Sequence, residues 1–158
     1  MSAKDIYDTA PLGSIIRYSN GEPRPPERFT RKVKAWENEN GTGRLVECSP
    51  GRDGATYRTP ATFTLHVGTY GSGGTIILVV RRVYMVESQL QFEVIERPAA
   101  GMVRILTKIG DHEELQHLAE DMPAAELWRA RHGYPGARCE TVEDPDLVDR
   151  AAVGRAAA

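Results

Sequence analysis

Four strand-like runs follow one another in the middle of this chain, and they constrain its fold more than any other feature. In the first run Phe63, Leu65 and Val67 alternate with polar residues, which is the period of a strand with one solvated face. The second run opens with a continuous apolar stretch, which indicates a strand buried on both faces. Because short links join the runs, we expect an antiparallel meander. The runs cover residues 61–67, 75–86, 89–96 and 102–109.

Helical patterns flank these runs on both sides. Phe29, Val33 and Trp36 lie on one face of a helix and predict an N-terminal helix. Asp111 with Glu114 resembles a capping box and predicts a helix after the last strand, which Pro123 restarts as a second segment. With shorter strands near 14–19 and 44–48, the pattern predicts an α+β fold with a sheet of about five or six strands. The predicted helices cover residues 26–39, 112–121 and 123–132.

The length and composition are those of one globular domain. The chain has 158 residues, of which 41% are hydrophobic and 27% charged, enough to bury a core. We expect a flexible N-terminal arm over residues 1–13, a single α+β domain over 14–145 and a weakly helical, Ala-rich tail over 146–158. No apolar run is long enough to span a bilayer, and the first residues lack the pattern of a secretory signal. The expected location is therefore cytoplasmic, where Cys48 and Cys139 stay reduced.

Charge is distributed unevenly along the chain. Residues 1–108 hold 15 basic and 11 acidic side chains, whereas residues 109–158 hold 5 basic and 11 acidic ones. Such a division steers partners by charge, or it reflects an ordinary solvated surface. It favours a protein partner or a homo-oligomer without choosing between them.

A basic segment precedes and enters the predicted N-terminal helix. Cations at this density can follow a phosphate backbone, which is the general electrostatic mode of nucleic-acid binding. Glu22, Glu27 and Glu37 dilute the cluster, and the sequence pI near 6.1 is low for a nucleic-acid-binding protein. Nucleic-acid contact is therefore an alternative interpretation beside ordinary solvated charge. The residues that would make this contact are Arg24, Arg28, Arg31, Lys32 and Lys34.

Glycines concentrate between the first two strand-like runs. This segment lacks the Lys-Ser/Thr ending of a phosphate-binding loop, and it joins two strands instead of a strand and a helix. We expect a flexible hairpin connection that serves as a recognition loop, because loops carry contacts and tolerate motion. The loop covers residues 68–74, and its candidate recognition residues are Gly68, Tyr70, Gly71, Gly73 and Gly74.

No catalytic or metal-binding motif stands out. His112 and His117 are five residues apart, whereas the zinc-protease motif needs a spacing of four to place both rings on one helix face. The two cysteines form no CxxC pair. The sequence therefore predicts no catalytic residue, no metal and no cofactor.

Three functional interpretations remain open. We predict a non-enzymatic module that docks on a protein partner, as a small bacterial, phage or plasmid accessory protein would. The first alternative is a nucleic-acid-associated protein that uses residues 24–34. The second is a small enzyme or ligand-binding domain, for which His66, Asp53, Tyr57 and Glu93 are scattered candidates.

Overall fold

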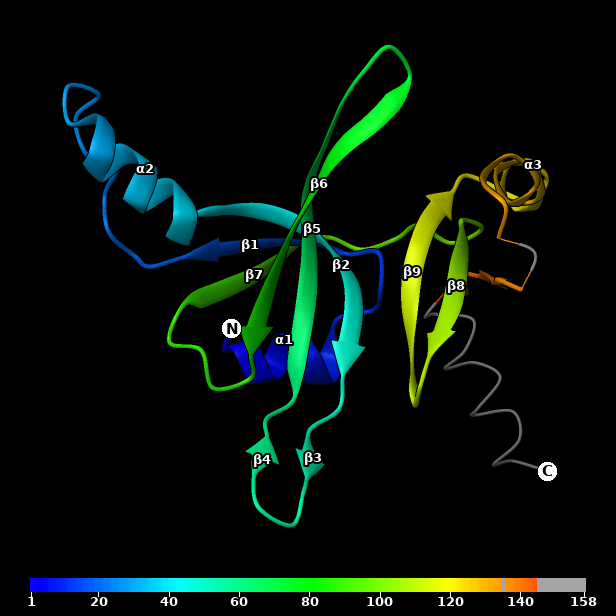
Figure 1. Ribbon diagram of the computed structural model, residues 1–158, viewed down its shortest axis with the longest axis horizontal. Helices are drawn as coiled ribbons and strands as arrows, with labels where there is room; N and C mark the ends of the chain where they lie inside the picture. Colours follow the sequence, from blue (N-terminus) through cyan, green and yellow to red (C-terminus); the bar gives the residue numbers. More distant parts are fainter. Residues whose placement is uncertain (135, 145–158) are drawn as a thin grey trace. The chain divides into compact units, whose positions relative to one another are not determined.

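The computed structural model describes residues 1–134 and 136–144, except for the side chain of Ile77. It confirms an α+β fold with an extensive antiparallel sheet, an N-terminal helix and a C-terminal helix (Figure 1). Contacts divide the chain into two compact units, Met1–Arg97 and Pro98–Ala158, which are described separately. The tail predicted over 146–158 lies outside the described residues.

The first unit is built mainly from antiparallel strands. Their pairing order is β7-β1-β2-β5-β6, so β7 lies beside β1 and not beside β6. Strands β1, β2, β5 and β6 therefore follow one another as an antiparallel meander, and β7 departs from it because it pairs with the N-terminal strand β1 and not with β6. The elements are α1 (Ala3–Thr9), β1 (Ile15–Ser19), α2 (Thr30–Glu39), β2 (Gly41–Ser49), β3 (Arg52–Asp53), β4 (Arg58–Thr59), β5 (Thr62–Ser72), β6 (Thr75–Met85) and β7 (Gln91–Glu96).

The segment 1–13, expected as a flexible arm, contains helix α1. Ser2 caps the helix: its Oγ accepts a hydrogen bond from the Asp5 amide at 3.2 Å, while the Asp5 carboxylate accepts one from the Ser2 amide at 2.7 Å. Ala3 and Ile6 are fully buried in the core of the unit. The apolar face of α1 therefore attaches the N-terminus to the sheet.

An aromatic cluster lies in the core of the first unit and consists of Tyr18, Phe63, Tyr84 and Phe92. Phe63 and Phe92 meet edge to face with ring centroids 5.3 Å apart, and Tyr84 lies 5.6 Å from Phe63. Burial, followed by the neighbouring Tyr18, raises the pKa of the Tyr84 phenol well above its ordinary value. Contacts between these rings pack β5 and β6 against β1 and β7.

Helix α2 begins at Thr30, later than the predicted range 26–39. Its N-cap residue, Phe29, makes no side-chain capping bond. The expected apolar stripe is covered in part: Val33 is buried, Trp36 is half-buried, and Phe29 is 42% exposed. Helix α2 packs against the rest of the first unit along a narrow face only.

The second unit is a small sheet with one helix. Strands β8 (Val103–Ile109), β9 (His112–Ala119) and β10 (Arg138–Thr141) pair antiparallel in the order β10-β8-β9. Helix α3 (Met122–His132) confirms the helix predicted over 123–132. Asp121 caps its start by accepting a hydrogen bond from the Ala124 amide at 2.8 Å, and Gly133 ends it at φ +68°.

The helix predicted over residues 112–121 is wrong, because this segment forms strand β9. Gly110, at φ +60°, and Asp111 form a two-residue turn that pairs Ile109 with His112. The Gly-Asp pair, and not a capping box at Asp111, was the informative signal. No helix in the described part of the chain is both long and apolar enough to cross a membrane.

Candidate functional site: the β5–β6 hairpin

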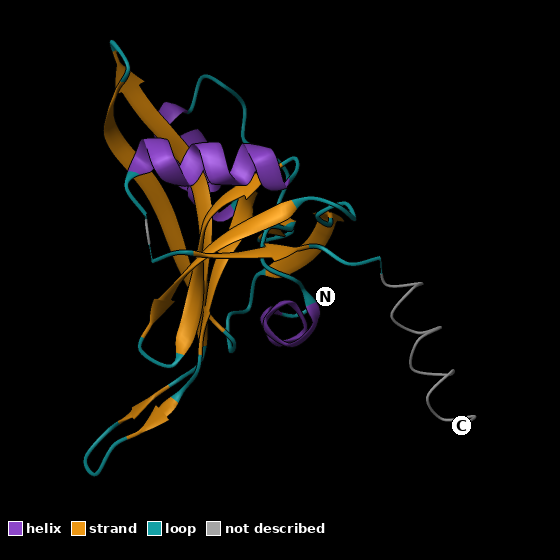
Figure 2. Ribbon diagram, turned by 90° about the vertical axis from the view of Figure 1, so that its right-hand side faces the viewer, coloured by secondary structure: helices purple, strands orange, loops and turns teal. Residues whose placement is uncertain are grey.

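The most unusual feature of the first unit is the length of its β5–β6 hairpin. Each strand has 11 residues, and the far end of the hairpin extends past the other strands of this unit (Figure 1, top). Figure 2 shows the same projection from the side, with the small β3–β4 hairpin at the opposite end of the unit. Gly73 and Gly74 form the turn at φ +59° and +80°, values that favour glycine at both positions.

The near half of the hairpin belongs to the core. Phe63 and Leu65 are fully buried, and Arg82 is held against helix α2. Its guanidinium donates to the Asn38 carbonyl oxygen at 2.7 Å and to Asn38 Oδ1 at 3.1 Å. This half is therefore a rigid base for what lies beyond it.

The far half carries large apolar side chains that the protein does not cover. The register shifts between His66 and Gly68, and the residues beyond this point are mostly exposed. Residues of this kind are normally buried, and their exposure marks a candidate interaction site. Leu78 and Val79 are consecutive in β6, so apolar side chains are exposed on both faces of the hairpin. The exposed fractions are 60% for Tyr70, 63% for Ile76, 54% for Leu78 and 44% for Val79.

These residues differ from the sequence-based expectation. The run after Gly74 was expected to be an interior strand buried on both faces, and the structure exposes it instead. The segment is apolar, as the sequence indicates, but no other described element of the unit covers it. Ile76, Leu78 and Val79 are thus candidate site residues that the sequence analysis missed.

The structure also relocates the predicted recognition loop. Gly68, Tyr70 and Gly71 lie in β5, and only Gly73 and Gly74 form the connection. A Cβ atom at Gly71 would lie 2.2 Å from the carbonyl oxygen of Thr75, so glycine is needed there for close approach of the two strands. A Gly-Gly pair between two strand-like runs was the signal for this tight turn.

The predicted basic site gathers around the start of α2. Arg24 is neutralised by Glu27 at 2.9 Å and Glu37 at 3.2 Å. The Arg28 guanidinium lies 4.7 Å, and the Lys32 ammonium 5.3 Å, from the centroid of the exposed Phe29 ring. Four exposed cations form no ion pair with any described residue: Arg28, Arg31, Lys32 and Lys34.

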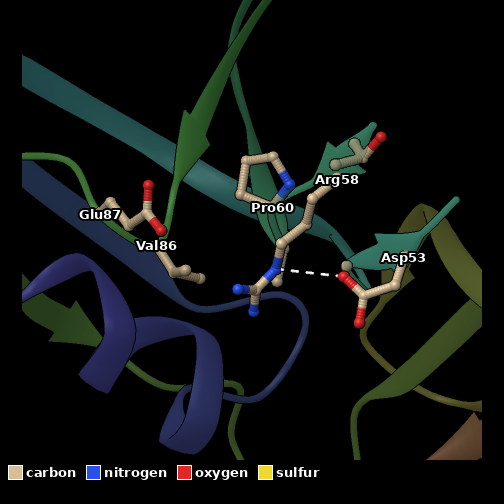
Figure 3. A pocket seen from close by; sticks show the side chains of 8 residues that line it. Asp53, Arg58, Pro60, Val86 and Glu87 are labelled. Atoms are coloured by element: carbon tan, nitrogen blue, oxygen red, sulfur yellow. Dashed lines mark ion pairs between the residues drawn. The ribbon is translucent and has the colours of Figure 1, made fainter. Parts of the chain in front are cut away.

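A shallow pocket of about 450 Å³ lies at the base of the β3–β4 hairpin. Figure 3 shows Asp53 and Arg58 facing each other beside Pro60, Val86 and Glu87. The Arg58 Nε to Asp53 Oδ1 distance is 3.2 Å, and both side chains are more than 80% exposed. Solvent screens such a pair strongly, so the pocket offers little for orienting a reacting group.

The scattered enzyme candidates do not form one site. His66 shares a hydrogen bond of 2.7 Å with Thr69 Oγ1, and Glu93 pairs with Arg17 at 3.1 Å. Tyr57 is 72% exposed. Within residues 1–134 and 136–144, no group of three or more histidine, cysteine or acidic side chains is placed to hold a metal ion.

Comparison with protein families gives one result. Residues 1–146 match the family described as uncharacterised conserved protein UCP036055, and the chain belongs to that family. Neither a curated protein nor a solved structure matches the chain.

Proposed function

We propose that this chain is a non-enzymatic protein-interaction module that docks on a protein partner through the far half of the β5–β6 hairpin. The observation that carries this proposal is the exposure of Tyr70, Ile76, Leu78 and Val79 on a ribbon whose base is buried. Burying one such aliphatic side chain against a partner contributes about 1.5–3 kcal/mol before the costs of association. A few residues are enough to supply most of the binding energy of an interface.

The surroundings of the hairpin support a docking role. Its base is fixed by the aromatic cluster and by the bonds from Arg82 to Asn38, so little order has to be gained when the tip binds. The separate partners of His66, Asp53 and Glu93 favour binding over catalysis. A small bacterial, phage or plasmid accessory protein acting in the cytoplasm is consistent with this role and with two cysteines that remain thiols.

The proposal is tested by site-specific photo-crosslinking in cells of the source organism. A crosslinker at Leu78 is expected to capture a defined protein, whereas one at the exposed Arg52 of β3 is not. Adding Ile76→Lys to the Leu78 crosslinking protein places a charge in the apolar contact and should abolish capture. Thr59→Lys adds the same charge at an exposed position of β4, away from the apolar side chains of the hairpin, as a matched control. Equal capture from Leu78 and Arg52, or capture that survives Ile76→Lys, would refute the proposal.

Helix α2 supports a second candidate, the binding of a polyanion such as nucleic acid. Arg31, Lys32 and Lys34 span an arc of roughly 160° that faces away from the buried Val33. Cations in the first turn of a helix are unfavourable for the helix dipole, and this turn contains no acidic residue. Because these cations reduce the stability of the helix, their presence favours a role in binding over a role in folding.

The second candidate predicts a steep dependence on salt. Affinity for a fluorescent single- or double-stranded oligonucleotide should fall as a power of the salt concentration, with a slope set by the number of phosphates neutralised. Arg31→Glu with Lys34→Glu should weaken binding at low salt, while Lys4→Glu, a distant exposed change, should not. A salt-independent affinity, or no loss with the double variant, would exclude this candidate.

A further inference from the structure

Helix α2 lies at the margin of the first unit (Figure 1), and it has a cationic face that its own acidic side chains leave uncompensated. Glu27 and Glu37 both bind Arg24, whose guanidinium lies 2.9 and 3.2 Å from their carboxylate oxygens. Glu39 accepts a hydrogen bond from Asn20 Nδ2 at 2.8 Å. The exposed cations that form no ion pair with any described residue are Arg28, Arg31, Lys32 and Lys34.

Two carboxylates beside α2 limit where an anion can bind. A shallow hollow of about 270 Å³ at the side of the helix is lined by Glu22, Glu39 and Lys32 together with apolar residues. The two carboxylates repel a phosphate from this hollow. On an α-helix Lys34 lies about 140° around the axis from Glu39, and Arg31 lies about 80° from it. Phosphate groups are therefore expected along Arg31 and Lys34, away from the hollow.

An exposed aromatic ring lies among these cations. Phe29 is 42% exposed, and its ring centroid is 4.7 Å from the Arg28 guanidinium and 5.3 Å from the Lys32 ammonium. The residue occupies the N-cap position of α2, where it makes no side-chain capping bond, although Ser, Thr, Asp and Asn are preferred there. Phe29 thus neither caps the helix nor buries its ring, so the stability of the fold does not explain a phenylalanine at this position.

An aromatic ring beside unpaired cations is complementary to a nucleotide. Proteins that bind single-stranded nucleic acid combine cations that contact the phosphates with aromatic side chains on which bases stack. Exposed cation–π contacts are weak, so a base can replace one cation on the Phe29 ring and leave that cation to a phosphate.

Other polyanions use less of this surface. A duplex keeps its bases stacked on one another, so it would contact the cations and leave the ring of Phe29 without a function. An anionic membrane binds helices through an exposed apolar face. In α2 that face is occupied, because Val33 is buried and Trp36 donates from Nε1 to the carbonyl oxygen of Glu22 at 2.8 Å. A single strand with accessible bases therefore fits the exposed residues better than either.

We propose that the outward face of α2 binds single-stranded nucleic acid, with a base stacked on Phe29 and the neighbouring phosphates on Arg31 and Lys34. The inference rests on the polyanion binding proposed above for this helix, and it adds which nucleic acid is bound and which residue recognises its bases. Stacking depends on the flat face that all bases share, so the site accepts DNA or RNA with little dependence on sequence.

The test compares two fluorescent probes of equal length and charge by anisotropy: an oligothymidylate, and an abasic oligonucleotide that keeps the phosphates and lacks the bases. The unaltered chain is expected to bind the oligothymidylate at least fivefold more tightly. Phe29→Leu should abolish this difference, whereas Phe29→Tyr keeps the ring and should preserve it. Arg31→Gln with Lys34→Gln should weaken both probes alike and reduce the salt slope for the single strand by about 1.4, or about 0.7 for each cation removed.

Three results would overturn the inference. They are equal affinity for the two probes, a difference that survives in Phe29→Leu, and tighter binding of a duplex or of phosphatidylserine vesicles than of the single strand. The comparison of the two probes uses the unaltered chain, so it stays decisive if a Phe29 variant does not fold. Equal affinities that still fall with salt and with the Arg31 and Lys34 changes would retain polyanion binding and exclude base stacking. Absence of binding to both probes would exclude both, and docking through the hairpin would be unaffected.

Discussion

Phe63 lies in the middle of the aromatic cluster, and its replacement by alanine tests the division of the hairpin into a structural base and an exposed tip. The ring is fully buried and contacts both Tyr84 and Phe92. Removing it forfeits about 1.5–3 kcal/mol of burial and about 0.5–1.5 kcal/mol for each aromatic pair. The expected loss of unfolding free energy is about 3–5 kcal/mol, the usual range for a buried Phe→Ala change.

Tyr70→Ala is the matched control, because it removes an aromatic ring seven positions further along the same strand. Tyr70 is 60% exposed, so the expected change is within about 0.5 kcal/mol. Urea unfolding in a Trp128→Phe background, followed by the fluorescence of Trp36, measures the first unit by itself. Equal losses for the two variants, or a loss below about 1 kcal/mol for Phe63→Ala, would refute the division.

Three further predictions concern ionisation and a helix end. The Arg138 guanidinium, bound to Glu113 at 2.7 and 3.0 Å, lowers the pKa of that carboxyl. The stability from this pair is therefore present at pH values above 4.5, the ordinary pKa of a glutamate carboxyl, and is lost as the pH falls through the lowered pKa. Glu113→Gln should flatten that part of an acid-unfolding curve. Burial, followed by Glu47, raises the pKa of the Cys48 thiol to about 11, so its alkylation by iodoacetamide should accelerate about tenfold per pH unit from pH 8 to 10; a plateau near pH 9 would contradict this. Gly133→Ala should cost about 1–2 kcal/mol at the left-handed end of α3, measured by thermal melts, whereas Gly136→Ala, where an added Cβ meets nothing within 4 Å, should not.

The candidate site was only partly accessible from the sequence. The segment around residues 68–74 was identified as a recognition element, and the hairpin tip lies within it. Ile76, Leu78 and Val79 were read as interior residues, because apolar character indicates what can be buried and not whether another element covers it. The basic residues of α2 were found by composition, but the neutralisation of Arg24 by Glu27 and Glu37 depends on how the chain before α2 folds back along the helix.

The sequence by itself determined the local elements whose signals are short-range. Alternation located β5, the run ending at Glu96 located β7, and the proline and glycine around α3 located that helix. The tertiary structure alone decided the pairing of β7 with β1 and the open edge of β6. Strand pairing joins residues far apart in the chain, and a strand's backbone bonds come from its neighbours, so neither the order nor the exposed edge is written in any local pattern.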